Sequence, residues 1–215
     1  MALTLWYHPL SSFCWKTLIA LYEAGVAFTP RQVDLTDPAD RQAFAAVWPL
    51  AKFPVLTDDA GTTVPESTII VEWLADRYPA ARALIPVDSA AAMKVRLLDR
   101  LFDNYVHQQL QQVVAERLRP AEAKDPFGVE RAKSAIAGGY DLIAPLLAKP
   151  WAIGETFTLA DCAALPALFY ADYSVSLDGW PELQAYLARL KTRPAIQRTL
   201  AEAEPFFQYF PLKDG

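Results

Sequence analysis

Residues 3–33 read LTLWYHPLSSFCWKTLIALYEAGVAFTPRQV, and this stretch decides the fold. Leu3–Tyr7 is a short apolar run, and Pro9 behind it cannot continue a central strand, so the run predicts a strand that ends in a loop. Apolar residues recur at helical spacing over Phe13–Glu23, and Phe28–Val33 fits a second strand. A strand, a helix and a strand in this order predict a βαβ unit, whose two strands lie parallel.

The next segments extend this unit by a helix, a hairpin and another helix. Asp37 and Pro38 mark the start of a helix that runs to about Val47. A strand that begins with a proline is predicted over residues 52–56, and residues 62–64 return as its hairpin partner. Ser67 is a suitable cap for a helix that ends at Tyr78-Pro79. The order of elements is then βαβ, helix, ββ, helix.

Beyond Pro79 only helical patterns remain, so the predicted fold class is α/β followed by all-α. We expect an N-terminal domain over residues 1–79, a linker over 80–89 and an all-helical domain over 90–215. The expected helices of that second domain cover residues 90–118, 126–147, 159–170, 181–190 and 194–203. The aromatic tail at 206–210 is expected to pack against the domain, because so many rings favour burial.

Composition excludes several classes of function. The 215 residues carry a formal net charge of −5 without a basic stripe, which argues against a nucleic-acid partner. The longest apolar stretch is far too short to span a membrane, and the first residues lack the pattern of a secretory signal. Cys14 and Cys162 are far apart and form no C-x-x-C, which favours a reducing compartment, the cytoplasm. With only His8 and His107 as histidines, we expect no metal site.

Three short segments are expected to meet at one end of the sheet. They are Ser11–Lys16 at the start of the first helix, Lys52-Phe53-Pro54 before the third strand, and Glu66-Ser67 at the start of a later helix. Two helix N-termini favour an anion there, and a proline before a strand leaves a backbone amide and carbonyl free for a ligand. Such a site suits an extended, peptide-like ligand that carries carboxylates and a thiol.

With these segments in place, the chain resembles the soluble (cytosolic) glutathione S-transferase family over essentially its whole length. The pattern Ser-Ser-x-x-Trp-Lys from Ser11, followed by Ile-Ala-Leu from Ile19, is most similar to the zeta class, with the theta-like bacterial enzymes next. The resemblance implies a thioredoxin-like glutathione-binding domain and a helical-bundle domain that forms the electrophile site. It also implies glutathione as co-substrate, a small hydrophobic electrophile as second substrate, and no metal.

The resemblance assigns roles to five residues of the glutathione site. The proline matching Pro54 is cis in the family, and the backbone of the residue before it, Phe53 here, pairs with the cysteinyl part of glutathione. Glu66 and Ser67 match the pair that holds the γ-glutamyl end, and Lys52 is in a position to meet the glycine carboxylate.

The serine that matches Ser11 donates a hydrogen bond to the glutathione sulfur in the family, and Ser12 is the alternative donor. Lowering a thiol pKa of about 8.5 by about 2 requires about 2.7 kcal/mol of stabilisation of the thiolate. A hydrogen bond to an ionised group contributes roughly 1.5–3 kcal/mol, and a helix N-terminus adds about 0.3–1 kcal/mol. The two together suffice, so the mechanism requires neither a metal nor a general base.

The electrophile pocket is expected between the two domains. The loop after the first strand and the first long helix of the second domain should line it, with the candidates Leu10, Phe102, Tyr105, Val106 and Gln109. For each of these residues, packing in the core or in a dimer interface is an equally good interpretation. The resemblance implies a homodimer, formed across the helix at 67–78 and the helix that begins at Ala90.

In the helical half, Phe157-Thr158-Leu159-Ala160-Asp161 resembles the buried capping box of the family, a structural feature. Cys162 is expected in the core, and Cys14 is expected to be a packed bystander. The alternative for Cys14 is a reactive thiol near a helix N-terminus, which would make the protein a glutathione-dependent disulfide reductase.

The leading prediction is therefore a glutathione S-transferase that attacks small hydrophobic electrophiles. The alternatives are a non-catalytic protein that binds glutathione or hydrophobic ligands, and an isomerase of the maleylacetoacetate type. Phe13 stands where zeta enzymes usually carry a cysteine, which weakens the case for the isomerase.

Overall fold

The computed structural model describes residues 2–211. Its first half begins with β1 (Leu3–Tyr7), α1 (Ser12–Glu23) and β2 (Thr29–Gln32), and β2 pairs parallel with β1. The predicted βαβ unit is therefore confirmed.

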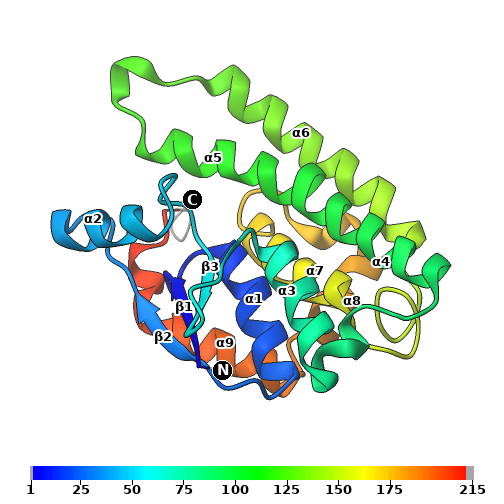
Figure 1. Cartoon of the computed structure of the whole chain (residues 1–215). Coiled ribbons are helices and arrows are strands. Elements are labelled where there is room, and N and C mark those ends of the chain that lie inside the picture. The colour runs from blue at the N-terminus through cyan, green and yellow to red at the C-terminus, as the bar shows by residue number, and fades with distance from the viewer. Residues whose placement is uncertain (1, 212–215) are drawn as a thin grey trace.

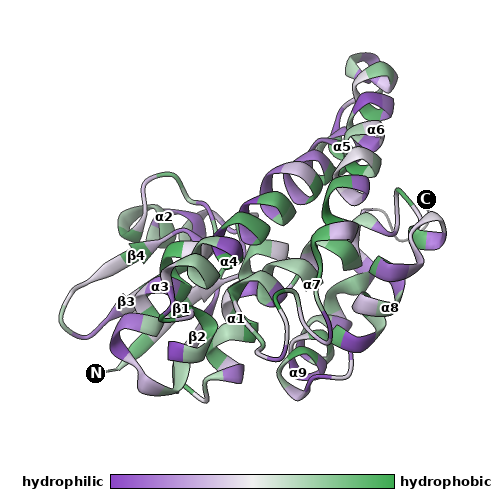
Figure 2. Cartoon of the chain, turned by 90° about the vertical axis from the view of Figure 1, so that its right-hand side faces the viewer, coloured by the Kyte–Doolittle hydropathy of each residue, from purple (hydrophilic) through white to green (hydrophobic). Residues whose placement is uncertain are grey.

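A second group of elements completes the sheet. It consists of α2 (Pro38–Val47), β3 (Val55–Asp58), β4 (Thr63–Pro65) and α3 (Ser67–Arg77). The strand order is β2-β1-β3-β4, with β3 antiparallel to both of its neighbours (Figure 2). This confirms the predicted order of βαβ, helix, ββ, helix, and it brings the ends of β1 and β2 and the start of β3 to one edge.

The two faces of the sheet pack against different helices. Leu5 and Leu56 belong to the large core that α1 and α3 share with the helical half. Their chain neighbours Trp6 and Val55 point to the opposite face, because successive side chains of a strand alternate. There Trp6 stacks on Phe44 of α2 with a centroid distance of 6.0 Å, within a smaller aromatic core.

The long helix predicted over 90–118 is interrupted by a π-helical segment. It consists of α4 (Ser89–Leu101), the π-helical segment Phe102–His107 and α5 (Gln108–Leu118). A π-helical turn takes an extra residue, so the side chains beyond it are rotated relative to a regular helix. The neighbouring helix comes very close here, since a Cβ added at Gly139 would lie 2.8 Å from the carbonyl oxygen of Tyr105.

The remaining helices lie close to the predicted ranges. The main ones are α6 (Pro126–Ile143), α7 (Leu159–Ala171), α8 (Pro181–Leu190) and α9 (Pro194–Ala203). Short 3₁₀ segments cover Pro79–Leu84, Ala121–Ala123, Ala144–Leu146, Leu177–Gly179 and Glu204–Tyr209. The first of these occupies much of the predicted linker, and the division at 79 and 89 stays a prediction.

One helix of the second half joins the two halves. Nearly all of α7 is buried, and it packs against α1, so one continuous apolar core spans both halves. Figures 1 and 2 show α5 and α6 side by side, extending beyond the rest of the molecule. None of the helices within 2–211 is long and apolar enough to cross a membrane.

The start of α7 is fixed by the predicted capping box. The backbone amide of Thr158 donates to Asp161 Oδ2 at 2.8 Å, and the reciprocal bond is also present. Asp161 Oδ1 accepts from Tyr186 Oη at 2.6 Å and from the Ala152 amide at 2.8 Å. Cys162 is fully buried next to it, so its predicted place in the core is confirmed.

Candidate active site

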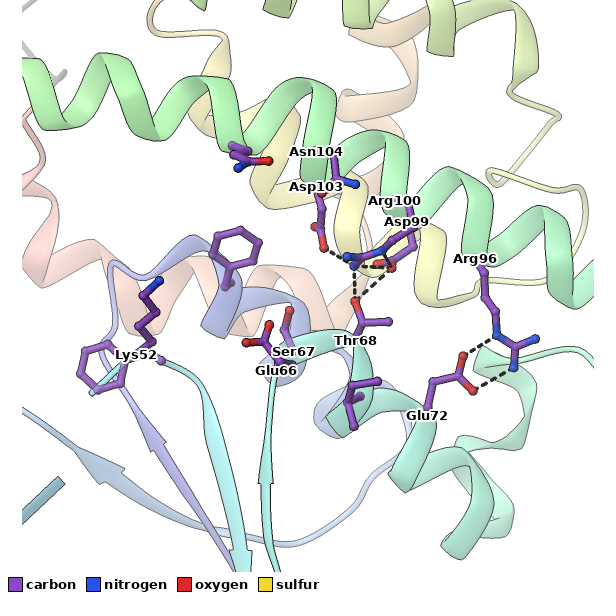
Figure 3. A pocket seen from close by; sticks show the side chains of 14 residues that line it. Lys52, Glu66, Ser67, Thr68, Glu72, Arg96, Asp99, Arg100, Asp103 and Asn104 are labelled. Carbon is purple, nitrogen blue, oxygen red and sulfur yellow. Dashed lines mark hydrogen bonds and ion pairs between the residues drawn. The ribbon is translucent and has the colours of Figure 1, made fainter. Parts of the chain in front are cut away.

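A cleft of about 720 Å³ lies where the start of α3 faces α4 and the π-helical segment. Lys52, from the loop before β3, and Glu66 and Ser67, at the start of α3, form one wall (Figure 3). Phe53, next to Lys52 in the chain, also lines the cleft. The opposite wall carries Arg96, Asp99, Arg100, Asp103, Asn104 and Gln108. The structure thus gathers the predicted glutathione-site residues in one cleft, except that Pro54 is buried and does not line it.

Backbone geometry shapes the first wall of this cleft. The peptide bond between Phe53 and Pro54 is cis, as the resemblance implies, and β3 begins only at Val55, so the backbone of Phe53 lies outside the strand ladder. Glu66 has φ of 69° and ψ of 119°, a sparsely populated backbone conformation that costs a residue other than glycine about 1–3 kcal/mol. Conformations of this kind persist where the surrounding structure enforces them, often at ligand sites.

The start of α3 differs from the prediction in one respect. Ser67 is the first helical residue rather than the cap, because Glu66 adopts the non-helical conformation of the N-cap position. The side chain of Glu66 makes no capping hydrogen bond, so the first amides of the helix have no side-chain partner. This positive helix end borders the cleft and favours a negatively charged group there.

The two serines at the start of α1 have different surroundings. Ser11 is half-buried at the N-cap position and makes no capping bond, whereas Ser12 is the first helical residue and is buried. Ser12 Oγ shares a hydrogen bond with His107 Nε2, and Gln111 Nε2 lies 3.5 Å from it. Neither serine lines the large cleft, and both line a second cavity.

His107 was not predicted to take part in a site. It comes from the π-helical segment, is fully buried, and stacks on Phe13 with a centroid distance of 4.0 Å. Burial, together with the charge of Lys16, lowers its pKa to about 3, so the ring is neutral at pH 7. Its Nδ1 atom has no hydrogen-bond partner among the described residues. A neutral imidazole thus holds both Ser12 and Phe13 in place.

Cys14 is the third residue of α1 and is fully buried. Burial raises the pKa of its thiol to about 12, although the Ser11 side chain and the His8 backbone favour the thiolate. A thiol of this kind stays protonated and unreactive at neutral pH. This environment supports the prediction of a packed bystander and disfavours a disulfide reductase that uses Cys14.

Behind the cleft, a buried cation joins three helices. Lys16 Nζ of α1 donates to Asp99 Oδ1 at 2.7 Å, to Asp103 Oδ2 at 2.6 Å and to Thr68 Oγ1 at 3.2 Å. Arg100 closes the cluster from the solvent side through both carboxylates. Burial raises the pKa of Asp103, and the charge of Lys16 opposes this rise. The sequence gives one signal of this cluster, which is that the charged residue Lys16 stands among the apolar residues of α1.

Within the described part of the chain, no group of three or more histidine, cysteine or acidic side chains could hold a metal ion.

The second cavity has a volume of about 240 Å³, and Phe13 lines both this cavity and the cleft. The other lining residues come from the loop after β1 and the start of α1, from α5, from α7 and from the C-terminal segment: Leu10, Ser11, Ser12, Leu110, Gln111, Val114, Tyr170, Phe210 and Pro211. The predicted packing of the aromatic tail is confirmed at Phe210, which is buried against Tyr170 with a centroid distance of 4.9 Å.

The five predicted electrophile-site residues do not stay together. Leu10 lines the second cavity, but Phe102 and Val106 are fully buried in the core. Tyr105 is half exposed, and Gln109 Nε2 bonds weakly to the Asn104 carbonyl at 3.4 Å. The helix instead turns Leu110, Gln111 and Val114 toward the cavity. Regular helical spacing predicts that other residues of α5 face the cavity, because it leaves out the extra residue of the π-helical segment, which rotates all later side chains about the helix axis.

Comparison with known proteins gives the same relationship over most of the chain. The family model described as "Glutathione S-transferase, N-terminal domain" matches residues 5–82, and the model described as "Glutathione S-transferase, C-terminal domain" matches residues 126–189. The chain is 30 % identical over 187 residues to the glutathione S-transferase GstA of Escherichia coli O157:H7, which covers 85 % of this chain and 90 % of that protein.

Two further similarities concern function and structure. The chain is 29 % identical over 172 residues to a maleylpyruvate isomerase of a Ralstonia species, which covers 77 % of this chain and 80 % of the isomerase. A crystal structure of a glutathione S-transferase from Methylobacillus flagellatus with GSH bound superposes with a TM-score of 0.84 at 29 % identity, covering 92 % of this chain and 98 % of that one.

Proposed function

The chain belongs to the glutathione S-transferase family, and from this premise we propose that it transfers glutathione to small hydrophobic electrophiles. The observation that carries the proposal is the large cleft, where Lys52, Phe53, Glu66 and Ser67 line one wall. Glutathione would lie along this wall, with a carboxylate at the open N-terminus of α3 and the other near Lys52. The GSH-bound relative from Methylobacillus flagellatus supports glutathione as the ligand.

The thiol of glutathione would lie where the cleft and the second cavity meet, beside Phe13. There Ser11 would donate a hydrogen bond to the sulfur and lower its pKa. We favour Ser11 over Ser12 because the hydroxyl of Ser12 already shares a hydrogen bond with His107. The electrophile would enter the second cavity, so its lining is Leu10, Leu110, Gln111, Val114 and Phe210 rather than the set expected from helical spacing.

The experiment that tests this proposal compares the wild type with Ser11→Ala and Ser12→Ala. Glutathione binding is followed by calorimetry, the pKa of the bound thiol by ultraviolet titration of the thiolate, and turnover with a chlorodinitrobenzene. Loss of a hydrogen bond to a charged group should raise the thiol pKa by about 1–2 and lower the rate about 10- to 150-fold. We expect this in Ser11→Ala.

Each other outcome has a distinct meaning. The same effect in Ser12→Ala alone would assign the role to Ser12. A protein that binds glutathione with an unperturbed thiol would be a non-catalytic binding protein. A protein that does not bind glutathione would contradict the proposal.

A second candidate is a glutathione-dependent isomerase, favoured by the similarity to the maleylpyruvate isomerase of Ralstonia. It uses the same thiolate, which would add to a double bond and leave again after rotation. Turnover of a maleyl substrate without formation of a stable conjugate would support it.

We also propose a homodimer formed through α3 and α4. Ile69, Met93 and Leu97 are at least half exposed on these helices, and Arg96 binds Glu72 between them with an Nε–Oε1 distance of 2.6 Å. The mass in solution, measured by light scattering, tests the dimer, and Met93→Glu should shift it toward the monomer.

We also propose a cytoplasmic location. The unpaired, buried Cys14 and Cys162 agree with it.

A further inference from the structure

Resting on the proposed function, we propose that the electrophile is a neutral, compact molecule whose reactive double bond is conjugated to a carbonyl, and that Gln111 binds that carbonyl. The electrophile lies in the second cavity, where Gln111 determines which substrates are accepted.

The size and walls of the cavity restrict the electrophile. Its volume of about 240 Å³ is below the roughly 300–1,000 Å³ of pockets for drug-sized ligands. Leu110, Val114 and Phe210 supply apolar surface. Tyr170 adds a ring, but its hydroxyl donates its proton to the Leu10 carbonyl at 3.0 Å, so it has no donor left for a ligand. The walls therefore favour a short, apolar chain or a small ring.

Few polar groups remain to orient such a molecule. Ser12 is engaged by His107, and Ser11 is assigned to the thiol. Gln111 makes one long contact to Ser12 Oγ at 3.5 Å, and its carboxamide carries two N–H donors. It is thus the side chain of this lining with a donor to spare. A carbonyl oxygen next to the reactive carbon is the acceptor that matches it.

The charges of the site lie elsewhere. Lys52, Arg96 and Arg100 line the large cleft, and Lys16 is bound to Asp99 and Asp103 behind it. The described residues that line the second cavity are all uncharged. A dicarboxylate would lose its hydration there without a countercharge from these residues, which is strongly unfavourable. A neutral electrophile does not meet this penalty.

The reaction is an addition. The sulfur of the glutathione thiolate forms a bond to the β-carbon, and the π electron pair of the carbon–carbon double bond moves toward the carbonyl oxygen. The enolate oxygen carries the charge, and the Gln111 N–H stabilises it. A proton from water then binds to the α-carbon. Nothing leaves, and no oxidant or reductant is required.

The test is a binding experiment that does not depend on turnover. We compare two glutathione conjugates, the adduct of methyl vinyl ketone and S-butylglutathione, which differ by the carbonyl. Dissociation constants are measured by calorimetry for the wild type, for Gln111→Leu, and for Gln112→Leu as the control. Gln112 is the next residue of α5, is exposed, and bonds only to Gln109.

We expect the carbonyl conjugate to bind roughly 3- to 10-fold more tightly in the wild type and in Gln112→Leu, the effect of one net hydrogen bond. In Gln111→Leu the two conjugates should bind equally. Equal affinities in the wild type, or a preference that survives in Gln111→Leu, would overturn the inference while glutathione binding remains. If neither conjugate nor glutathione binds, the proposed function fails together with the inference.

A kinetic comparison provides the second arm. Methyl vinyl ketone should be conjugated faster than maleylpyruvate is isomerised, as measured by kcat/KM at equal glutathione concentration. The opposite order would show that a dicarboxylate is the better substrate, and it would overturn the inference.

Discussion

The large cleft and the second cavity meet at Phe13, and they are made from different kinds of contact. The first wall of the cleft is shaped by the backbone, at the cis bond before Pro54 and at Glu66. Charged side chains surround this wall. The cavity is formed by side chains from four segments that are far apart in the sequence. A cleft of the first kind suits one constant ligand, whereas a cavity of the second kind can change its ligand through single substitutions.

The largest effect is expected behind the cleft, at Lys16. Lys16→Met removes the buried cation between Asp99 and Asp103 and leaves them only the partly exposed Arg100, which should lower the free energy of unfolding by about 3–5 kcal/mol. Urea denaturation measures it. Lys133→Met is the control, because the exposed pair of Lys133 with Glu130 should contribute at most about 1 kcal/mol. Equal losses would mean that the cluster does not hold the cleft together.

The stability of the protein should depend on pH through His107, which stacks on Phe13, where the two regions meet. Burial lowers its folded-state pKa from 6.5 to about 3. As the pH falls below 6.5, the unfolded chain takes up a proton that the folded chain does not. The stabilisation is therefore complete above pH 6.5 and is lost progressively down to about pH 3.

Relative to His107→Gln, the wild type should lose about 2 kcal/mol of stability between pH 6.5 and pH 5. Denaturant titrations at the two pH values measure this difference. His8→Gln is the control, because His8 is only partly buried and should change the slope less. A wild-type slope equal to that of His107→Gln would show that the ring is accessible to protons.

A substitution in the cavity should separate the two regions in the kinetics. Val114→Phe fills part of the second cavity, so kcat/KM for the electrophile should fall about tenfold, which corresponds to about 1.4 kcal/mol. Glutathione binding, measured by calorimetry, should not change. Weaker glutathione binding in this variant would show that the cleft and the cavity are not independent.

The smallest effect is expected at Glu66, where the backbone of the cleft can be changed without the cavity. Glu66→Gly should be more stable than Glu66→Ala by about 1 kcal/mol, because glycine adopts the positive φ without steric cost. Both variants lose the side chain and should bind glutathione equally weakly. Thermal unfolding and calorimetry measure the two properties, and a more stable alanine variant would refute the argument.

The sequence by itself determined the sheet, most helices and the first wall of the cleft. Short-range patterns suffice for these, since β1 and α1 follow from hydrophobic spacing and Pro54 marks the start of β3. The capping box of Thr158 and Asp161 is likewise a pattern of neighbouring residues. The conformation of such segments is determined by residues close together in the chain, so it can be predicted without knowledge of tertiary contacts.

Only the tertiary structure decided the buried cluster of Lys16 and the face that α5 turns toward the second cavity. The partners of Lys16 lie more than eighty residues away, at Asp99 and Asp103, and no local pattern pairs them. The π-helical segment forms where Gly139 lets a neighbouring helix approach, and it rotates Leu110 and Gln111 into the cavity. Each residue of a helix is placed relative to the one before it, so one extra residue in one turn rotates every later side chain about the helix axis.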